Sequence, residues 1–298
     1  TRWLISAFAI ALTGLAILRA LDLPYRLGIA ILTEQVVATA LAIGLALAFL
    51  YFGIDRKPRR VLPWYDALGA AAGFCGAMFV AIRYPLIIDE LAEPPLHNVA
   101  VGVLLLLLLI EGLRRTAGPI LVVIVSIFLA YAFFGEYMPA PLQGRDIPFA
   151  HVIGFLTMEQ GLVAPPLVIA STVVVMFIFF GQLLFASGGS SFFTDLSTTL
   201  VGRYRGGSAK IAIGASALFG SISGSAVSNV VTTGVITIPL MNEGGYSRRH
   251  AAAIEAVAST GGQIMPPVMG AAAFLMAEYL GIGYGEVVVA AFLPALLY

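Results

Sequence analysis

The feature that most constrains this chain is a series of apolar runs near 20 residues long, separated by short charged clusters. A helix needs about 20 apolar residues to cross the ~30 Å hydrocarbon core of a bilayer. Such runs are predicted at Trp3–Leu21, Val36–Ile54, Asp66–Ile82, Val99–Leu113, Pro119–Met138 and Pro165–Ser187. Only 11% of the residues are charged, and the formal net charge is zero. The chain is therefore predicted to be an all-α polytopic membrane protein with six ordinary spans in the lipid bilayer, and no basic surface indicates nucleic-acid binding.

The pattern changes beyond Ser187. Apolar residues at helical spacing within Gly188–Arg205 predict an amphipathic helix on the membrane surface. The apolar stretch Ile211–Met241 is interrupted by the polar, glycine-rich run Gly220–Asn229, which predicts two half-helices in a re-entrant hairpin. The stretch His250–Leu280 is interrupted at Ser259–Pro267, which predicts a discontinuous helix.

The distribution of Lys and Arg favours this topology, because cytoplasmic loops of membrane proteins carry an excess of both. With a cytoplasmic N-terminus, the inner side carries Arg2, Arg56, Lys57, Arg59, Arg60, Arg114, Arg115, Arg203, Arg205, Lys210, Arg248 and Arg249. The outer side carries Arg19, Arg26, Arg83 and Arg145. If Ile211–Met241 were a single crossing, Arg248 and Arg249 would move outside and the asymmetry would weaken.

The two breaks are the candidate binding site, since non-helical backbone at membrane depth is tolerated only inside protein or along a water-filled cavity. Half-helix N-termini suit carboxylates, and hydroxyl, amide and carbonyl oxygens suit Na⁺. The candidates for binding substrate or ion are Ser221, Ser223, Gly224, Ser225, Ser228, Asn229, Thr232, Ser259, Thr260, Gly261, Gly262, Gln263, Pro266 and Pro267. The Na⁺ candidates among them are Ser223, Ser225, Asn229 and Gly261. The alternative is that these small residues only mediate helix packing and that the prolines only kink a helix.

Glu255 lies near both breaks, where an ionisable residue is either functional or interfacial. Glu278 is expected at the outer surface, and Glu111 with Arg114 is expected to form an ordinary helix-end pair. Enzyme motifs are absent, and neither a catalytic residue nor a cofactor is expected. Two alternatives from other classes remain: an intramembrane serine hydrolase using Ser223 or Ser225, and an ion channel.

The second half resembles the fused membrane permease of TRAP transporters, the tripartite ATP-independent periplasmic type, in its TAXI class. The resemblance is carried by Gly202–Gly207, Leu218–Gly234 and Ala258–Gly270, with looser support from Glu111–Thr116. It implies an elevator-type secondary transporter of the bacterial inner membrane that imports an organic anion, a carboxylate, by Na⁺ symport. It also implies a separate periplasmic solute-binding protein as partner.

The resemblance further implies a division of the chain into three parts. Residues 1–116 would be small-subunit-like helices, residues 117–210 the start of the large-subunit scaffold with a surface arm helix, and residues 211–298 the first half of a transport domain. Transport domains of this family contain an inverted repeat, and this chain is expected to be a fragment that carries one copy of it.

Overall fold

The computed structural model describes residues 2–57, 62–158 and 161–298, and its regular structure is helical. Six helical segments are long and apolar enough to cross a membrane, as predicted. They are Arg2–Ala20, Thr33–Tyr51, Trp64–Glu90, Leu96–Thr116, Pro119–Tyr137 and Pro165–Ala186. The chain forms two compact units, one ending at Thr172 and one beginning at Val173.

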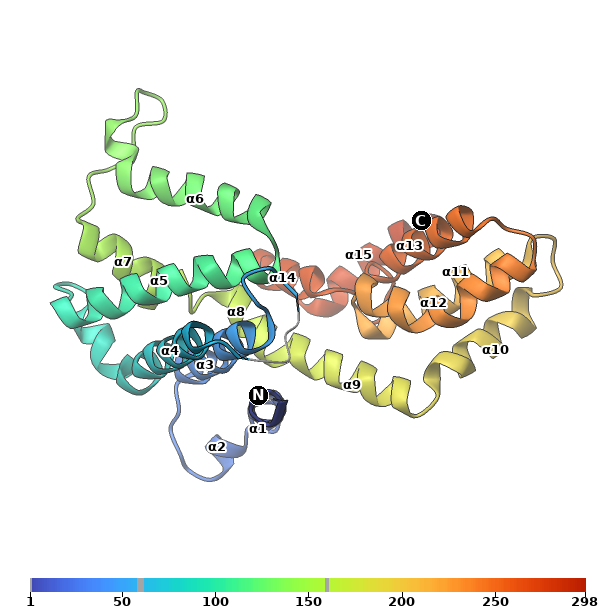
Figure 1. Ribbon diagram of the computed structural model, residues 1–298, viewed down its shortest axis with the longest axis horizontal. Helices are drawn as coiled ribbons and strands as arrows, with labels where there is room; N and C mark the ends of the chain where they lie inside the picture. The colour runs from blue at the N-terminus through green and yellow to red at the C-terminus, as the bar shows by residue number, and fades with distance from the viewer. Residues whose placement is uncertain (1, 58–61, 159–160) are drawn as a thin grey trace. The chain divides into compact units, whose positions relative to one another are not determined.

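The first unit contains helices α1 (Arg2–Ala20), α2 (Leu23–Arg26), α3 (Thr33–Tyr51), α4 (Trp64–Glu90), α5 (Leu96–Thr116), α6 (Pro119–Phe134), α7 (Phe149–Met158) and α8 (Pro165–Ile169) (Figure 1). Its closest packing is between α3 and α4. A Cβ atom on Gly69 or Gly73 would lie 2.7 Å from Phe49 or 2.8 Å from Leu45, so these glycines let the two helices approach. Small residues at a helix contact are the usual means of close packing in membranes.

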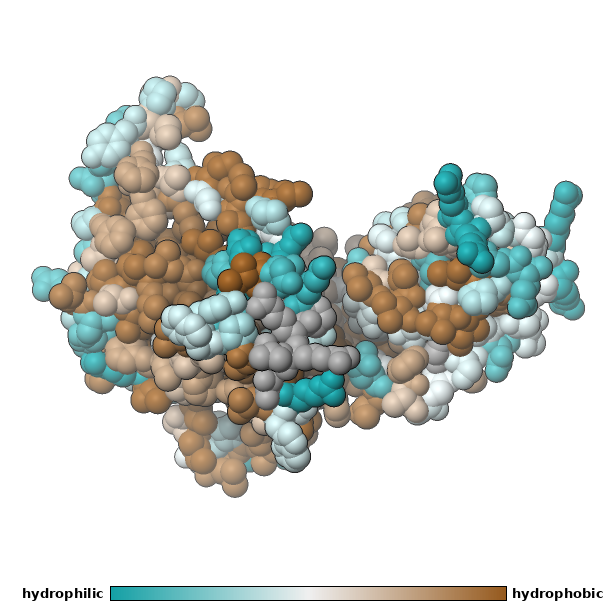
Figure 2. Space-filling view, in the orientation of Figure 1, coloured by the Kyte–Doolittle hydropathy of each residue, from teal (hydrophilic) through white to brown (hydrophobic). Residues whose placement is uncertain are grey.

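The surface of the first unit is apolar over α5 and α6 (Figure 2). Leu107, Ile120, Ile127 and Phe128 all present more than half of their surface, from 60% to 76%. A lipid-facing helix needs no polar residue on its outer side, because the acyl chains are as apolar as leucine. These exposed side chains are therefore suited to contact lipid.

The second unit is built around α11 (Gly207–Ser223), which packs mainly against three helices: α10 (Gly189–Val201), α12 (Ala226–Glu243) and α13 (Arg248–Gly262). The unit also contains α9 (Val175–Ala186), α14 (Ala271–Leu280) and α15 (Tyr284–Leu297). A five-residue π-helical turn, Ala170–Val174, precedes α9. The helix predicted within Gly188–Arg205 is present as α10, with Phe192 and Leu200 exposed.

Helices α11 and α12 form the predicted hairpin. Ser208, near the start of α11, lies against Gly244 just after α12, and Ser216 and Thr233 meet halfway along. The two ends of the hairpin therefore lie together. Each arm is about 25 Å long at ~1.5 Å per residue, longer than half of a ~30 Å hydrocarbon core.

Both breaks differ in extent from the prediction. The hairpin break is only Gly224 and Ser225 rather than Gly220–Asn229, because Gly224 adopts the left-handed conformation (φ 62°) that ends α11 and Ser225 begins α12 at once. In the second element, Ser259–Gly262 remain helical in the last turn of α13. The non-helical segment there is 263–270, since a helix tolerates Gly261 and Gly262 but not the following Pro266 and Pro267.

Candidate functional site

The turn at the hairpin tip is stabilised by Ser225, which caps the N-terminus of α12. The Ser225 Oγ accepts a hydrogen bond from the Ser228 backbone N–H at 3.3 Å, the usual role of a serine that precedes a helix. The tip touches the second break directly, where the Val268 backbone N–H donates to the Ser221 carbonyl at 3.0 Å. Gly224 packs so closely on the Met269 carbonyl that a Cβ atom would not fit there. The two breaks are thus brought together, as the sequence predicted.

A cavity of about 440 Å³ lies where the breaks meet. Its polar lining includes Ser223, Ser225 and Gln263, and its apolar wall includes Phe177 and Phe274. The rings of Phe177 and Phe274 stack at 5.5 Å, and Phe274 stacks on Tyr284 at 4.3 Å. The Tyr284 hydroxyl donates to the Val268 carbonyl, which holds the broken segment against this aromatic wall.

Ser223 is the distinctive polar residue of this cavity. Its side chain is 7% exposed, and its hydroxyl has no hydrogen-bond partner among the described residues. A buried hydroxyl without a partner is costly, so such groups in native proteins usually serve a ligand or water. The N-terminus of α14 also faces the cavity through Ala271 and Ala272. The first backbone N–H groups of a helix have no hydrogen-bond partners inside that helix. Together these donors suit a negatively charged ligand.

A second polar cluster is fully buried between α11, α12 and α13. Glu255 is 0% exposed, and its Oε1 accepts hydrogen bonds from Ser216 at 2.9 Å, Thr233 at 2.5 Å and Ser259 at 3.2 Å. Its Oε2 accepts from Thr237 at 2.5 Å. Both carboxylate oxygens are therefore enclosed by hydroxyls from three helices, and Glu255 is shielded from solvent.

Asn229 extends this cluster. Its side-chain amide donates to the Ser216 carbonyl at 2.7 Å, and its Oδ1 lies 3.1 Å from the Thr233 hydroxyl oxygen. Asn229 is 0% exposed, so its amide is engaged within the hairpin rather than directed into the cavity. The Na⁺ role predicted for Asn229 stays a prediction.

The remaining predicted residues have other surroundings. Gly261 lies beneath the ring of Tyr298, and Gly262 faces Gly220, where a Cβ atom would come within 2.7 Å of the Gly220 Cα. The Thr260 hydroxyl donates to the carbonyl of Ala256 in the preceding turn, at 2.8 Å. The cavity thus gathers Ser223, Gly224, Ser225 and Gln263, and its lining does not include Ser221, Ser228, Asn229, Thr232, Ser259, Thr260, Gly261, Gly262, Pro266 and Pro267.

Sequence reasoning missed the partners of Glu255 on the hairpin. Asn229, Thr233 and Thr237 recur at every fourth position, so they share one face of α12, and this spacing was the available signal. It indicates a polar stripe that must be satisfied inside the protein. The partner Ser216 on α11 gave no comparable signal, because it stands alone in an apolar run.

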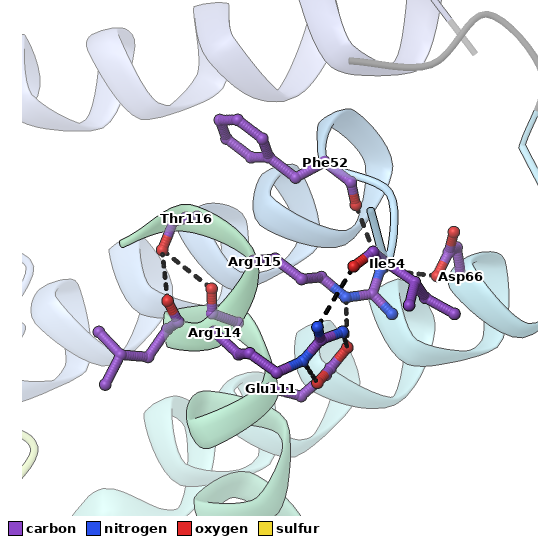
Figure 3. Close-up of polar contacts among 9 residues, drawn as sticks. Phe52, Ile54, Asp66, Glu111, Arg114, Arg115 and Thr116 are labelled. Carbon is purple, nitrogen blue, oxygen red and sulfur yellow. Dashed lines mark hydrogen bonds and ion pairs between the residues drawn. The ribbon is translucent and has the colours of Figure 1, made fainter. Parts of the chain in front are cut away.

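An ion cluster in the first unit joins the end of α5 to the start of α4 (Figure 3). Arg114 forms the predicted pair with Glu111, with nitrogen to oxygen distances of 2.7 and 2.8 Å. Arg115 forms an unpredicted pair with Asp66 at 2.6 Å, and it also donates to the Phe52 carbonyl at 3.2 Å. The Arg115 guanidinium lies 4.5 Å from the centre of the Phe49 ring. We interpret this cluster as structural, because it connects α4 with α5.

A hairpin and a discontinuous helix that meet around a polar cavity, in an all-helical chain with six membrane-length segments, define a membrane transport protein of the secondary type. Comparison with known proteins gives the family. Residues 103–298 match the family described as the tripartite ATP-independent periplasmic transporter, DctM component. The chain belongs to this family, which is a family of membrane permeases and not of enzymes.

Individual relatives agree with this assignment. The uncharacterized protein YgiK of Salmonella typhimurium is 27% identical over 187 residues, which are 57% of this chain and 42% of YgiK. The isethionate TRAP transporter permease protein DctMQ of Oleidesulfovibrio alaskensis is 37% identical over 94 residues, 32% of this chain and 15% of DctMQ. The 2,3-diketo-L-gulonate TRAP transporter large permease protein YiaN of Escherichia coli is 30% identical over 94 residues, 32% of this chain and 22% of YiaN. The chain thus spans less than half of the length of these relatives.

The family match begins at residue 103, so residues 1–102 lie outside it. The small-subunit identity of residues 1–116 and the TAXI class stay predictions. The family and the six apolar segments together imply a multi-pass protein of the bacterial inner membrane.

Proposed function

We propose that the complete protein imports an organic anion by Na⁺ symport, and that a periplasmic solute-binding protein delivers the anion. The solute site is the cavity between the hairpin tip and the segment 263–270. The observation that carries this proposal is the Ser223 hydroxyl, which is buried, lines the cavity and has no partner among the described residues.

The chemistry of the cavity favours a carboxylate. The Ser223 hydroxyl and the first N–H groups of α14 are donors, and an anion accepts from both. The aromatic wall of Phe177 and Phe274 gives the rest of the solute an apolar surface. Arg and Lys do not line this cavity in the part of the chain that the structure describes, so the anion would be held by neutral donors and remain free to leave.

Na⁺ is proposed to bind beside the same tip. A hard cation takes several neutral oxygens at once. Ser223 and Ser225 flank Gly224, on which the Met269 carbonyl packs, and all four residues line the cavity. Their oxygens come from both breaks. Binding of Na⁺ would therefore hold the hairpin tip against the discontinuous element, which would link ion binding to the shape of the solute site.

A hydrolase is disfavoured by the same geometry. A nucleophilic serine needs an adjacent base, and no histidine lines the cavity within the described residues. His250 lies at the other end of α13, where its ring nitrogen is 3.0 Å from the Ser247 hydroxyl.

Uptake by the complete permease in proteoliposomes, with its solute-binding protein added outside, tests the proposal. Suitable labelled solutes are a C4-dicarboxylate, isethionate, sialic acid and 2,3-diketo-L-gulonate, the solutes in the names of relatives. An inward Na⁺ gradient should drive accumulation of one such anion, and dissipating that gradient should abolish it. Accumulation that ignores Na⁺ but collapses with the proton gradient would show that Na⁺ coupling is wrong.

A further inference from the structure

The hydrogen bonds of Glu255 join three helices at one point. Ser216 belongs to α11, Thr233 and Thr237 belong to α12, and Glu255 itself lies on α13. Among the described residues, every side-chain hydrogen bond between the hairpin and α13 ends on this carboxylate. A single residue thus provides the directional contacts between the two elements.

Small residues make up much of the rest of this interface, and the larger side chains of Met241, Ile238 and Ile254 pack at one end of it. Gly220 faces Gly262, and a Cβ atom added to Gly234 would lie 3.3 Å from the Glu255 Cγ. Alanines of α11 and α13 share a small core with Met241. Glycine and alanine surfaces let helices approach closely, but they present no large side chains that interlock. Where small residues face one another, sliding of one helix along another is weakly opposed, so the directional hydrogen bonds contribute to setting the register there.

We propose that Glu255 is a positioning residue, whose carboxylate fixes the α11–α12 hairpin on α13 and thereby sets the geometry of the cavity. The connection to the cavity is short. Ser216 lies two turns before Ser223 on α11, and Glu255 lies two turns before Gln263, the first residue after α13. A shift of the hairpin along α13 would therefore change the separation of Ser223 and Gln263 across the cavity. The relevance of this role to transport rests on the proposed function, whereas its effect on cavity geometry does not.

The acceptor capacity of the Glu255 side chain predicts which replacement preserves the register. The Oε1 receives three hydroxyls, and the Oε2 receives only Thr237. The Thr237 hydroxyl also lies 3.0 Å from the Thr233 carbonyl. In Glu255→Gln, Thr237 could donate to that carbonyl and accept from the new amide, while the amide oxygen keeps the other three hydroxyls. Glutamine should therefore preserve the register, and alanine should not.

Thiol accessibility at Ser223 tests this without a known solute. In the complete permease, with Cys75 and any other cysteine replaced, Ser223→Cys is reacted with a small methanethiosulfonate reagent in detergent. Because local opening exposes buried positions, adding Glu255→Ala should accelerate modification by about tenfold or more, whereas Glu255→Gln should leave it within about twofold. Glu278→Ala is the matched control, since Glu278 is an exposed carboxylate in the same discontinuous element.

Equal rates in the parent and in Glu255→Ala would overturn the proposal, as would equally fast rates in the glutamine and alanine variants. If Glu255→Ala fails to fold, Ser216→Ala and Thr237→Val each remove one hydroxyl, and each should accelerate modification by a smaller factor.

Transport then separates positioning from ion coupling. A positioning role predicts that Glu255→Gln retains both gradient-driven accumulation and solute exchange, whereas alanine raises the solute concentration for half-maximal exchange. A glutamine variant that exchanges solute but cannot accumulate it would overturn the positioning role in favour of a coupling role. Absence of uptake by the parent protein would count against the proposed function and leave the accessibility result valid.

Discussion

Arg115 and Asp66 form an ion pair that is almost completely removed from solvent, with side chains 5% and 2% exposed and a nitrogen to oxygen distance of 2.6 Å. The pair joins the last turn of α5 to the first turn of α4. By contrast, the neighbouring pair of Arg114 and Glu111 leaves about a third of each side chain exposed, at 34% and 32%. The two pairs lie side by side at the end of α5, and their burial predicts very different contributions to stability.

Replacing Asp66 with alanine should strongly destabilise the first unit. Arg115 would keep its 2.7 Å contact with the Glu111 carboxylate but lose its buried partner, and breaking a buried pair costs up to about 3–5 kcal/mol. Arg114→Gln is the matched control, because exposed pairs contribute about 1 kcal/mol or less. Thermal unfolding in detergent, followed by circular dichroism, should show a much lower melting temperature for Asp66→Ala than for Arg114→Gln. Similar melting temperatures for the two variants would contradict the structural role given to the buried pair.

The contact between Gly220 and Gly262 predicts a second sensitive position. A Cβ atom on Gly262 would lie 2.7 Å from the Gly220 Cα and 3.0 Å from the Ser216 carbonyl oxygen, and backbone atoms cannot move aside as a side chain can. Gly262→Ala should therefore push α11 and α13 apart and lower stability by about 1–3 kcal/mol or more. Gly285→Ala is the control, since nothing lies within 4 Å of its added Cβ. Equal thermal stability of the two variants would show that α11 and α13 are less closely packed at Gly220 and Gly262 than the structure describes.

Element type was predictable because length and polarity decide it. Runs near 20 apolar residues became the six membrane-length segments, and polar glycine-rich interruptions became the hairpin and the discontinuous helix. The extent of each break was not predictable from composition. Ser221 and Ser223 could equally end a helix or unwind it, and the left-handed conformation of Gly224 settled the matter within one residue.

The site was predictable only in part for a related reason. The sequence shows which residues are polar, but not which polar groups satisfy one another. Asn229 pairs with Ser216 and Thr233 inside the hairpin, whereas Ser223 has no partner in the described part of the chain. The two residues are six positions apart and of similar polarity, so only the three-dimensional arrangement separates the structural role from the ligand-facing one.

Ser223→Ala and Asn229→Ala should consequently behave differently. Ser223 makes no hydrogen bond that would be lost, so its alanine variant should fold normally and should raise the Na⁺ concentration for half-maximal uptake several-fold. Asn229→Ala leaves the Ser216 carbonyl without its side-chain donor and should lower stability by about 1–3 kcal/mol. Membrane expression, melting temperature and Na⁺-dependent uptake are the measurements. Normal stability of Asn229→Ala with weakened Na⁺ dependence would instead support Asn229 as an ion ligand.

Ser225→Ala should give an intermediate result. The Ser225 Oγ caps α12 and also lines the cavity, and loss of an N-cap serine costs about 1 kcal/mol. Ser225→Asp is the informative companion, because aspartate is an equally good cap but brings a negative charge into a site proposed for an anion. The aspartate variant should keep its melting temperature and lose uptake. Unchanged uptake would show that Ser225 does not face the solute.

The hairpin makes a prediction about membrane sides. Gly206 precedes α11, and Tyr246 follows α12. A Cβ atom added to Gly206 would lie 3.4 Å from the Tyr246 hydroxyl oxygen, so the two ends of the hairpin open on the same side. Arg205 and Arg248 flank these ends, and the excess of basic residues predicts that this side is cytoplasmic. Arg205→Cys and Arg248→Cys should therefore both be protected from an impermeant thiol reagent applied to intact cells, and both should react after permeabilisation.

A cysteine introduced at Gln143, in the loop between α6 and α7, is the control and should react from outside. Labelling of Arg248→Cys alone from outside would replace the hairpin with a single crossing, and labelling of both would invert the orientation while keeping the hairpin.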